Sequence, residues 1–173
     1  MTVNEGIAQV STLATHSALT IWNFGSDFLI IIIPTAAFFF FAWYVGRGPF
    51  VAILLAFYSA FAIYNLFPYM SILPTAPAIT AFLAHTGLYL ALSFAFYIVL
   101  RRVVVSDFLY VGTIGLTILS FCATAFLLAL AHHTFGVNAI YTFTPPVDAL
   151  FSPDKYFFWW FIAPAVGLFF LAR

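Results

Sequence analysis

The chain has 173 residues, of which 65% are hydrophobic and only 6% are charged, and its formal net charge is zero. A soluble domain carries roughly a quarter of charged residues because its surface must face water, so this composition excludes an ordinary soluble domain. The largest basic cluster is the pair Arg101 and Arg102, which excludes nucleic-acid binding through phosphate neutralisation.

The first 26 residues are too polar to cross a bilayer, but they have the pattern of an amphipathic helix. Apolar residues recur at steps of three and four from Val3 to Phe24, and polar residues such as Glu5 occupy the other face. We therefore expect residues 1–26 to form a helix that lies on the outer membrane surface or docks on a partner.

Residues 27–173 contain five apolar stretches, each close to the length of about 20 residues that a helix needs to cross the hydrocarbon core. They cover residues 28–45, 50–67, 78–100, 107–131 and 156–172. The sequence therefore predicts an all-α fold: a polytopic membrane helix bundle with about five transmembrane helices.

The basic residues indicate how this bundle is oriented. Arg47 lies between the first and second stretches, Arg101 and Arg102 between the third and fourth, and Arg173 at the end. With five spans these places share one side, and the other side has Lys155 as its one basic residue. Because cytoplasmic loops are enriched in Lys and Arg, we expect the N-terminus outside and the C-terminus inside. The very short loops favour a prokaryotic source, and hence its plasma (inner) membrane.

The longest loop, residues 132–155, is too apolar for a free linker, and we expect it to form a cap on the outer membrane face. It begins with His132 and His133 and later contains Asp148 and Asp154. A cluster of histidines and carboxylates could bind a metal or act on a lipid headgroup. The spacing matches no metal motif, so the sequence predicts no metal site, and the four residues remain candidates for catalysis.

His85 is the one ionisable side chain well inside a predicted span, where polar groups cost free energy and often mark functional sites. Tyr89 lies one helical turn further on, and Asn65 and Thr117 are polar residues of the neighbouring spans. These four residues are candidates for a ligand site or a polar pathway. Alternatively, His85 is a neutral histidine that hydrogen-bonds a tyrosine or carbonyl and packs two helices together. We favour this alternative because no second buried histidine or carboxylate accompanies His85.

Hydroxyl residues recur along one side of the fourth predicted span, at Thr113, Thr117, Ser120 and Thr124. Small and hydroxylated residues let membrane helices approach closely and hydrogen-bond across the contact. We interpret them as a helix-packing stripe, with a narrow polar pathway as the alternative.

The sequence contains no phosphate-binding glycine loop, HExxH motif, nucleophile elbow or pair of intramembrane carboxylates, and it indicates no cofactor. We therefore predict a non-enzymatic subunit or scaffold of a membrane complex. Its expected partners are the lipid bilayer and either further copies of the chain or another membrane protein. One alternative is a small transporter or channel component that uses the polar faces of the second to fourth spans. The other is a membrane enzyme that acts at the outer leaflet.

Overall fold

The computed structural model describes residue 25 and residues 28–103, 112–143 and 145–171. The surface helix expected for residues 1–26 therefore lies outside the described residues, apart from Gly25.

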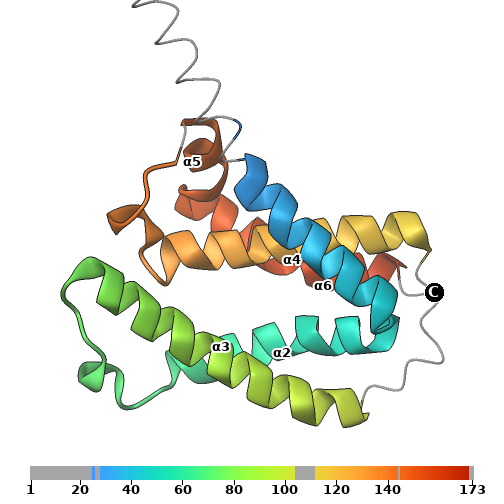
Figure 1. The fold of residues 1–173 in the computed structure, drawn as a ribbon, viewed down its shortest axis with the longest axis horizontal. Helices are drawn as coiled ribbons and strands as arrows, with labels where there is room; N and C mark the ends of the chain where they lie inside the picture. Colours follow the sequence, from blue (N-terminus) through green and yellow to red (C-terminus); the bar gives the residue numbers. More distant parts are fainter. Residues whose placement is uncertain (1–24, 26–27, 104–111, 144, 172–173) are drawn as a thin grey trace, which may run out of the picture.

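The described residues form α-helices and short 3-10 helices, with no strand among them (Figure 1). The first helix is Phe28–Tyr44. The elements that follow are α2 (Arg47–Asn65), η1 (Met70–Ile72), α3 (Ala78–Val103), α4 (Thr113–His133), η3 (Val137–Ala139), α5 (Pro145–Phe151) and α6 (Asp154–Leu171). The prediction of an all-α protein is confirmed.

Three of the described helices, α2, α3 and α4, are long and apolar enough to cross a membrane. The helix Phe28–Tyr44 is also apolar but shorter. The remaining long helix, α6, begins with Asp154 and Lys155. The three long apolar helices indicate a membrane protein.

Several helix boundaries differ from those expected from hydropathy, among them the start of α4, which lies at Thr113 instead of residue 107. α2 begins at Arg47 instead of residue 50, because proline at Pro49 is tolerated in a first turn, where the backbone N–H has no partner within the helix. Gly46 allows the reversal before α2, since its φ of 110° is a conformation that side chains disfavour. α4 continues to His133, two residues into the segment expected as the outer cap.

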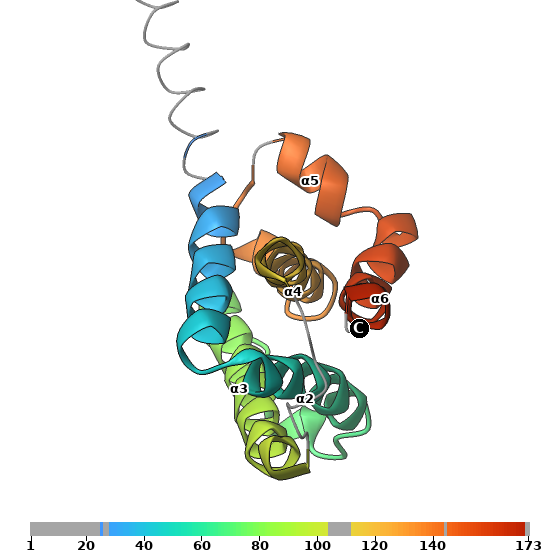
Figure 2. The same cartoon turned by 90° about the vertical axis from the view of Figure 1, so that its right-hand side faces the viewer.

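The long helices are arranged as two antiparallel pairs. α2 packs on α3, α4 packs on α6, and all four run nearly along one axis (Figure 1). Seen along this axis, the helix Phe28–Tyr44 lies along one side of both pairs (Figure 2). It contacts α2 through Phe38, whose ring meets the edge of Phe57 with the centroids 6.0 Å apart.

Aromatic side chains fill the space between the pairs. Phe57 of α2 stacks on Tyr89 of α3 and on Phe126 of α4, with ring centroids 6.4 Å and 6.3 Å apart. Tyr64 and Phe135 close this cluster towards the end of α4, with their rings 5.6 Å apart. The centre of the described bundle is therefore packed with rings, as expected of a rigid helix assembly.

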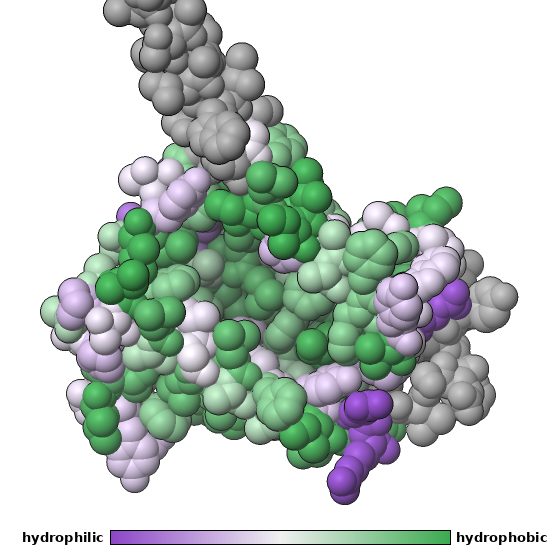
Figure 3. Space-filling view, in the orientation of Figure 1, coloured by the Kyte–Doolittle hydropathy of each residue, from purple (hydrophilic) through white to green (hydrophobic). Residues whose placement is uncertain are grey.

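The outside of the bundle is largely apolar (Figure 3), and the three arginines of the described residues lie at one end. Arg47 begins α2, whereas Arg101 and Arg102 lie in the last turn of α3. Because α2 and α3 are antiparallel, these three residues lie at the same end of the bundle. α5 and the first residues of α6, Asp154 and Lys155, lie at the other end (Figure 1).

Candidate functional site

His132, near the end of α4, is held between a backbone carbonyl and a carboxylate. Its Nδ1 donates to the carbonyl oxygen of Leu128 at 2.9 Å, and its Nε2 lies 3.5 Å from Asp148 Oδ1 of α5. The histidine side chain is only 1% exposed, and neither Nε2 nor Oδ1 has a hydrogen-bond partner. Since a carbonyl can only accept, Nδ1 carries the proton, and a neutral ring turns a lone pair towards Asp148.

His133, the next residue, has the same arrangement with its nitrogens exchanged. Its Nε2 donates to the carbonyl oxygen of Phe151 at 2.9 Å, and its Nδ1 lies 3.3 Å from Asp154 Oδ1. The ring also packs against Phe157 of α6, with the centroids 4.7 Å apart. Consecutive residues of one helix thus reach α5 and α6 separately.

The four candidate residues of the outer cap therefore meet as two separate His–Asp pairs. In each ring one nitrogen is bonded to a carbonyl and the other faces a carboxylate, and the unpartnered Nε2 of His132 is buried. Among the described residues, no group of three or more His, Cys, Asp or Glu is placed to hold a metal ion. This geometry ties α5 and the start of α6 to the end of α4.

His85 of α3 is hydrogen-bonded to Tyr64 of α2, with Nδ1 and the hydroxyl oxygen 2.8 Å apart. The rings also meet edge to face, with their centroids 6.2 Å apart. This is the contact with a tyrosine of a neighbouring helix that we expected for a packing role of His85.

The other three candidates for a ligand site or pathway are either bonded within the core or exposed. Tyr89 is buried in the aromatic core, where its hydroxyl donates to the carbonyl oxygen of Phe57 at 3.1 Å. Asn65 is exposed at the end of α2. Thr117 is exposed on α4, and its hydroxyl donates to the carbonyl oxygen one turn earlier.

The hydroxyl stripe of α4 is divided between two environments. Ser120 and Thr124 are buried, and the Thr124 hydroxyl oxygen lies 3.0 Å from Thr35 Oγ1 of the helix Phe28–Tyr44. Thr113 and Thr117 are exposed. The second half of the stripe is therefore buried in the bundle, whereas the first half is exposed.

A further stripe, which the sequence-based prediction missed, lies on the outward face of α3. Gly87, Ala91 and Ala95 follow one another at intervals of four residues and are all exposed. A Cβ atom added at Gly87 would meet no atom within 4 Å. The interval is readable in the sequence, but which way these residues face depends on how α3 packs on α2.

Large side chains border this stripe on the same face of α3. Leu83, Leu90 and Phe94 are 62%, 52% and 65% exposed. At about 100° of turn per residue, their row runs beside the row of Gly87, Ala91 and Ala95. The outward face of α3 thus has a row of large residues next to a row of small ones.

Comparison with protein family models, curated proteins and solved structures finds no match in any of the three. The described structure therefore defines the class, an all-helical membrane protein with three helices long enough to span a bilayer.

Proposed function

We propose that the protein is a non-enzymatic subunit of a membrane complex, and that it assembles with a second copy of itself through α3. The observation that carries this proposal is the outward stripe of Gly87, Ala91 and Ala95. In a membrane, lipid tails are as apolar as leucine, so helices associate mainly where small residues allow close packing.

In this proposal each copy crosses the membrane five times, through the helix Phe28–Tyr44, α2, α3, α4 and α6. Arg47, Arg101 and Arg102 support placing the end of the bundle that carries them in the cytoplasm, because inner loops are enriched in basic residues. The N-terminus is then outside and the C-terminus inside. The short loops favour a prokaryotic plasma membrane.

A second copy is the favoured partner because of the symmetry that a membrane imposes. Copies of one chain insert in a single orientation, so the axis of a symmetric pair runs along the membrane normal. α3 then meets α3 in the same direction, and the same face meets itself. Leu83, Leu90 and Phe94 of one copy can pack against the row of small residues of the other.

The two alternatives have less support. A transporter pathway would need polar groups that line a common path through the bundle, whereas Asn65 and Thr117 are exposed and the core is aromatic. An outer-leaflet enzyme would need an accessible base, whereas the His132 side chain is only 1% exposed and His133 has one nitrogen bonded to a carbonyl and the other 3.3 Å from Asp154.

Substitution of Gly87→Leu tests the proposal in the purified protein, because a side chain there has open space in the single chain. Native mass spectrometry after gentle solubilisation is expected to give a dimer for the wild type and a monomer for this variant. The matched control is Ala62→Leu, a similar change at an exposed residue of α2, which should remain dimeric. A dimer that survives Gly87→Leu would rule out the α3 contact. A wild-type monomer with no crosslinked partner would rule out the subunit proposal itself.

A further inference from the structure

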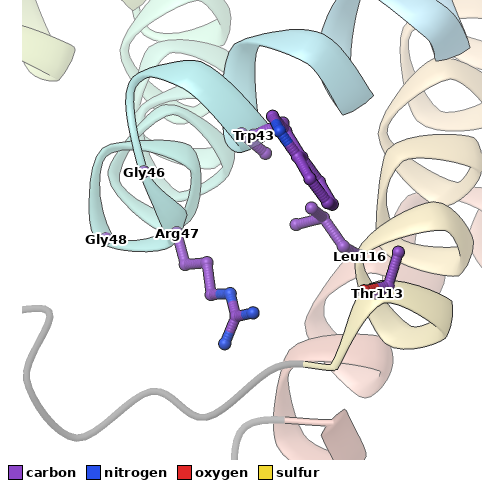
Figure 4. Close-up of a pocket in the computed structure, with 7 residues that line it drawn as sticks. Trp43, Gly46, Arg47, Gly48, Thr113 and Leu116 are labelled. Atoms are coloured by element: carbon purple, nitrogen blue, oxygen red, sulfur yellow. The ribbon is translucent and has the colours of Figure 1, made fainter.

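Two hollows follow one another along the seam between the helix Phe28–Tyr44 and α4. The first is a cavity of about 410 Å³ at the basic end of the bundle, lined by Trp43, Arg47, Thr113 and Leu116 among others (Figure 4). The second is an open groove of about 560 Å³, which begins one helical turn further along both helices.

The cavity has the groups that bind an anion. The Arg47 side chain extends from the start of α2 into the space in front of α4, where Thr113 presents its hydroxyl (Figure 4). Both α2 and α4 begin here, and their N-cap residues, Gly46 and Gly112, have no side chain to cap the first-turn N–H groups. Helix N-termini carry partial positive charge, and arginine matches the geometry of phosphate oxygens.

The groove, in contrast, is almost entirely apolar. Its walls include Phe28, Ile32 and Phe40 from the first helix and Thr117 and Phe121 from α4. From Phe28 to Phe40 it extends for about 18 Å at the rise of an α-helix, close to one leaflet of a core roughly 30 Å thick.

The two hollows are neighbours in the fold. Phe39, which lines the groove, stacks on Trp43, which lines the cavity, with the ring centroids 5.9 Å apart. On α4, Thr117 of the groove lies one turn after Thr113 of the cavity. A cavity that contains an arginine thus lies next to an apolar groove along the same two helices.

We propose that this seam is a binding site for an anionic phospholipid of the bilayer. The phosphate binds at Arg47 and Thr113, and one acyl chain lies in the groove between the first helix and α4. The cavity alone would bind any anion and the groove alone any apolar chain, whereas together they match the phosphate and the acyl chain of one lipid. The site depends on the membrane placement of the bundle, but it does not depend on pairing through α3.

Titration of the full-length protein with phosphatidylglycerol, followed by native mass spectrometry, tests the phosphate contact. Arg47→Gln should weaken binding about tenfold, the order expected for loss of one charge-assisted hydrogen bond, and Arg47→Lys should weaken it less. The control is Arg101→Gln, which removes an exposed charge at the same end but outside the cavity and should leave binding within about twofold. Equal losses for Arg47→Gln and Arg101→Gln would overturn the site in favour of general attraction to the basic end, and no loss for Arg47→Gln would also overturn it.

A second pair of measurements tests the groove and keeps the proposal decidable if Arg47→Gln does not fold. Thr117→Phe fills the groove from an exposed position, and should weaken long-chain phosphatidylglycerol several-fold more than a short-chain form. If Thr117→Phe weakened the binding of both chain lengths equally, the acyl chain would not bind in the groove. Glycerol 3-phosphate should compete poorly, and competition at the affinity of the whole lipid would reassign the cavity to a free phosphate ester.

Discussion

The Nε2 atom of His132 faces the Oδ1 atom of Asp148 across 3.5 Å, and both atoms are buried without a hydrogen-bond partner. Because Nδ1 of the same ring donates to the Leu128 carbonyl, a neutral ring and an ionised carboxylate present two acceptors to each other. A donor placed between these atoms would therefore strengthen the contact that holds α5 against α4.

The change Asp148→Asn supplies such a donor, because an amide N–H can reach the Nε2 lone pair. We expect it to raise the free energy of unfolding by about 1 kcal/mol, the typical net value of a hydrogen bond. Thermal unfolding of the protein in nanodiscs measures the effect. Asp154→Asn is the control, since the side chain of Asp154 is fully exposed and should contribute little. A lower stability for Asp148→Asn would show that the pair is held as an ion pair instead.

The Tyr64–His85 hydrogen bond joins α2 to α3, and its removal should loosen that hairpin. Tyr64→Phe is expected to lower the free energy of unfolding by about 1 kcal/mol, since it removes the hydroxyl and leaves the ring packing in place. Tyr44→Phe is the matched control, because Tyr44 is 84% exposed. If Tyr64→Phe left the stability unchanged, the structural role of His85 would be wrong, and a functional role would become the better explanation.

Gly167 brings α6 close to α4, in contrast to the open position of Gly87. A Cβ at Gly167 would lie 3.1 Å from Leu119 Cδ1 of α4. We expect Gly167→Leu to cost about 1–3 kcal/mol of folding stability by overpacking. Gly87→Leu, by the same thermal measurement, should leave the unfolding of the monomer nearly unchanged. Comparable losses in the two variants would mean that α3 is covered within the single chain.

The orientation proposed for the bundle can be tested by labelling single cysteines in intact cells. In a Cys122→Ala background, Asn138→Cys at the α5 end should react with a membrane-impermeant maleimide. Arg102→Cys at the basic end should react only after the membrane is permeabilised. Both positions are exposed, so accessibility within the protein does not limit the reaction. The reverse pattern would invert the topology.

The apolar helices and the turns between them could be predicted directly from the sequence, because both depend on residues that are adjacent in the chain. Long apolar runs predicted helices that the structure contains in α2, α3 and α4, and the glycines and prolines near Gly46 and Pro68 predicted where the chain turns. The extension of α2 back to Arg47 was missed, since proline can belong to a first turn, and so were the start of α4 at Thr113 and its continuation to His133.

The partners of the polar residues were decided by the tertiary structure. Thr117 and Thr124 belong to one predicted stripe, yet Thr117 is exposed whereas Thr124 meets Thr35. Gly87 has the small-residue spacing of many packed membrane helices, but it faces outward because α3 turns Tyr89 towards α2. The sequence by itself thus determined an all-helical, membrane-type chain. Which face of each helix is covered depends on contacts between residues far apart in the chain, and local patterns do not contain that information.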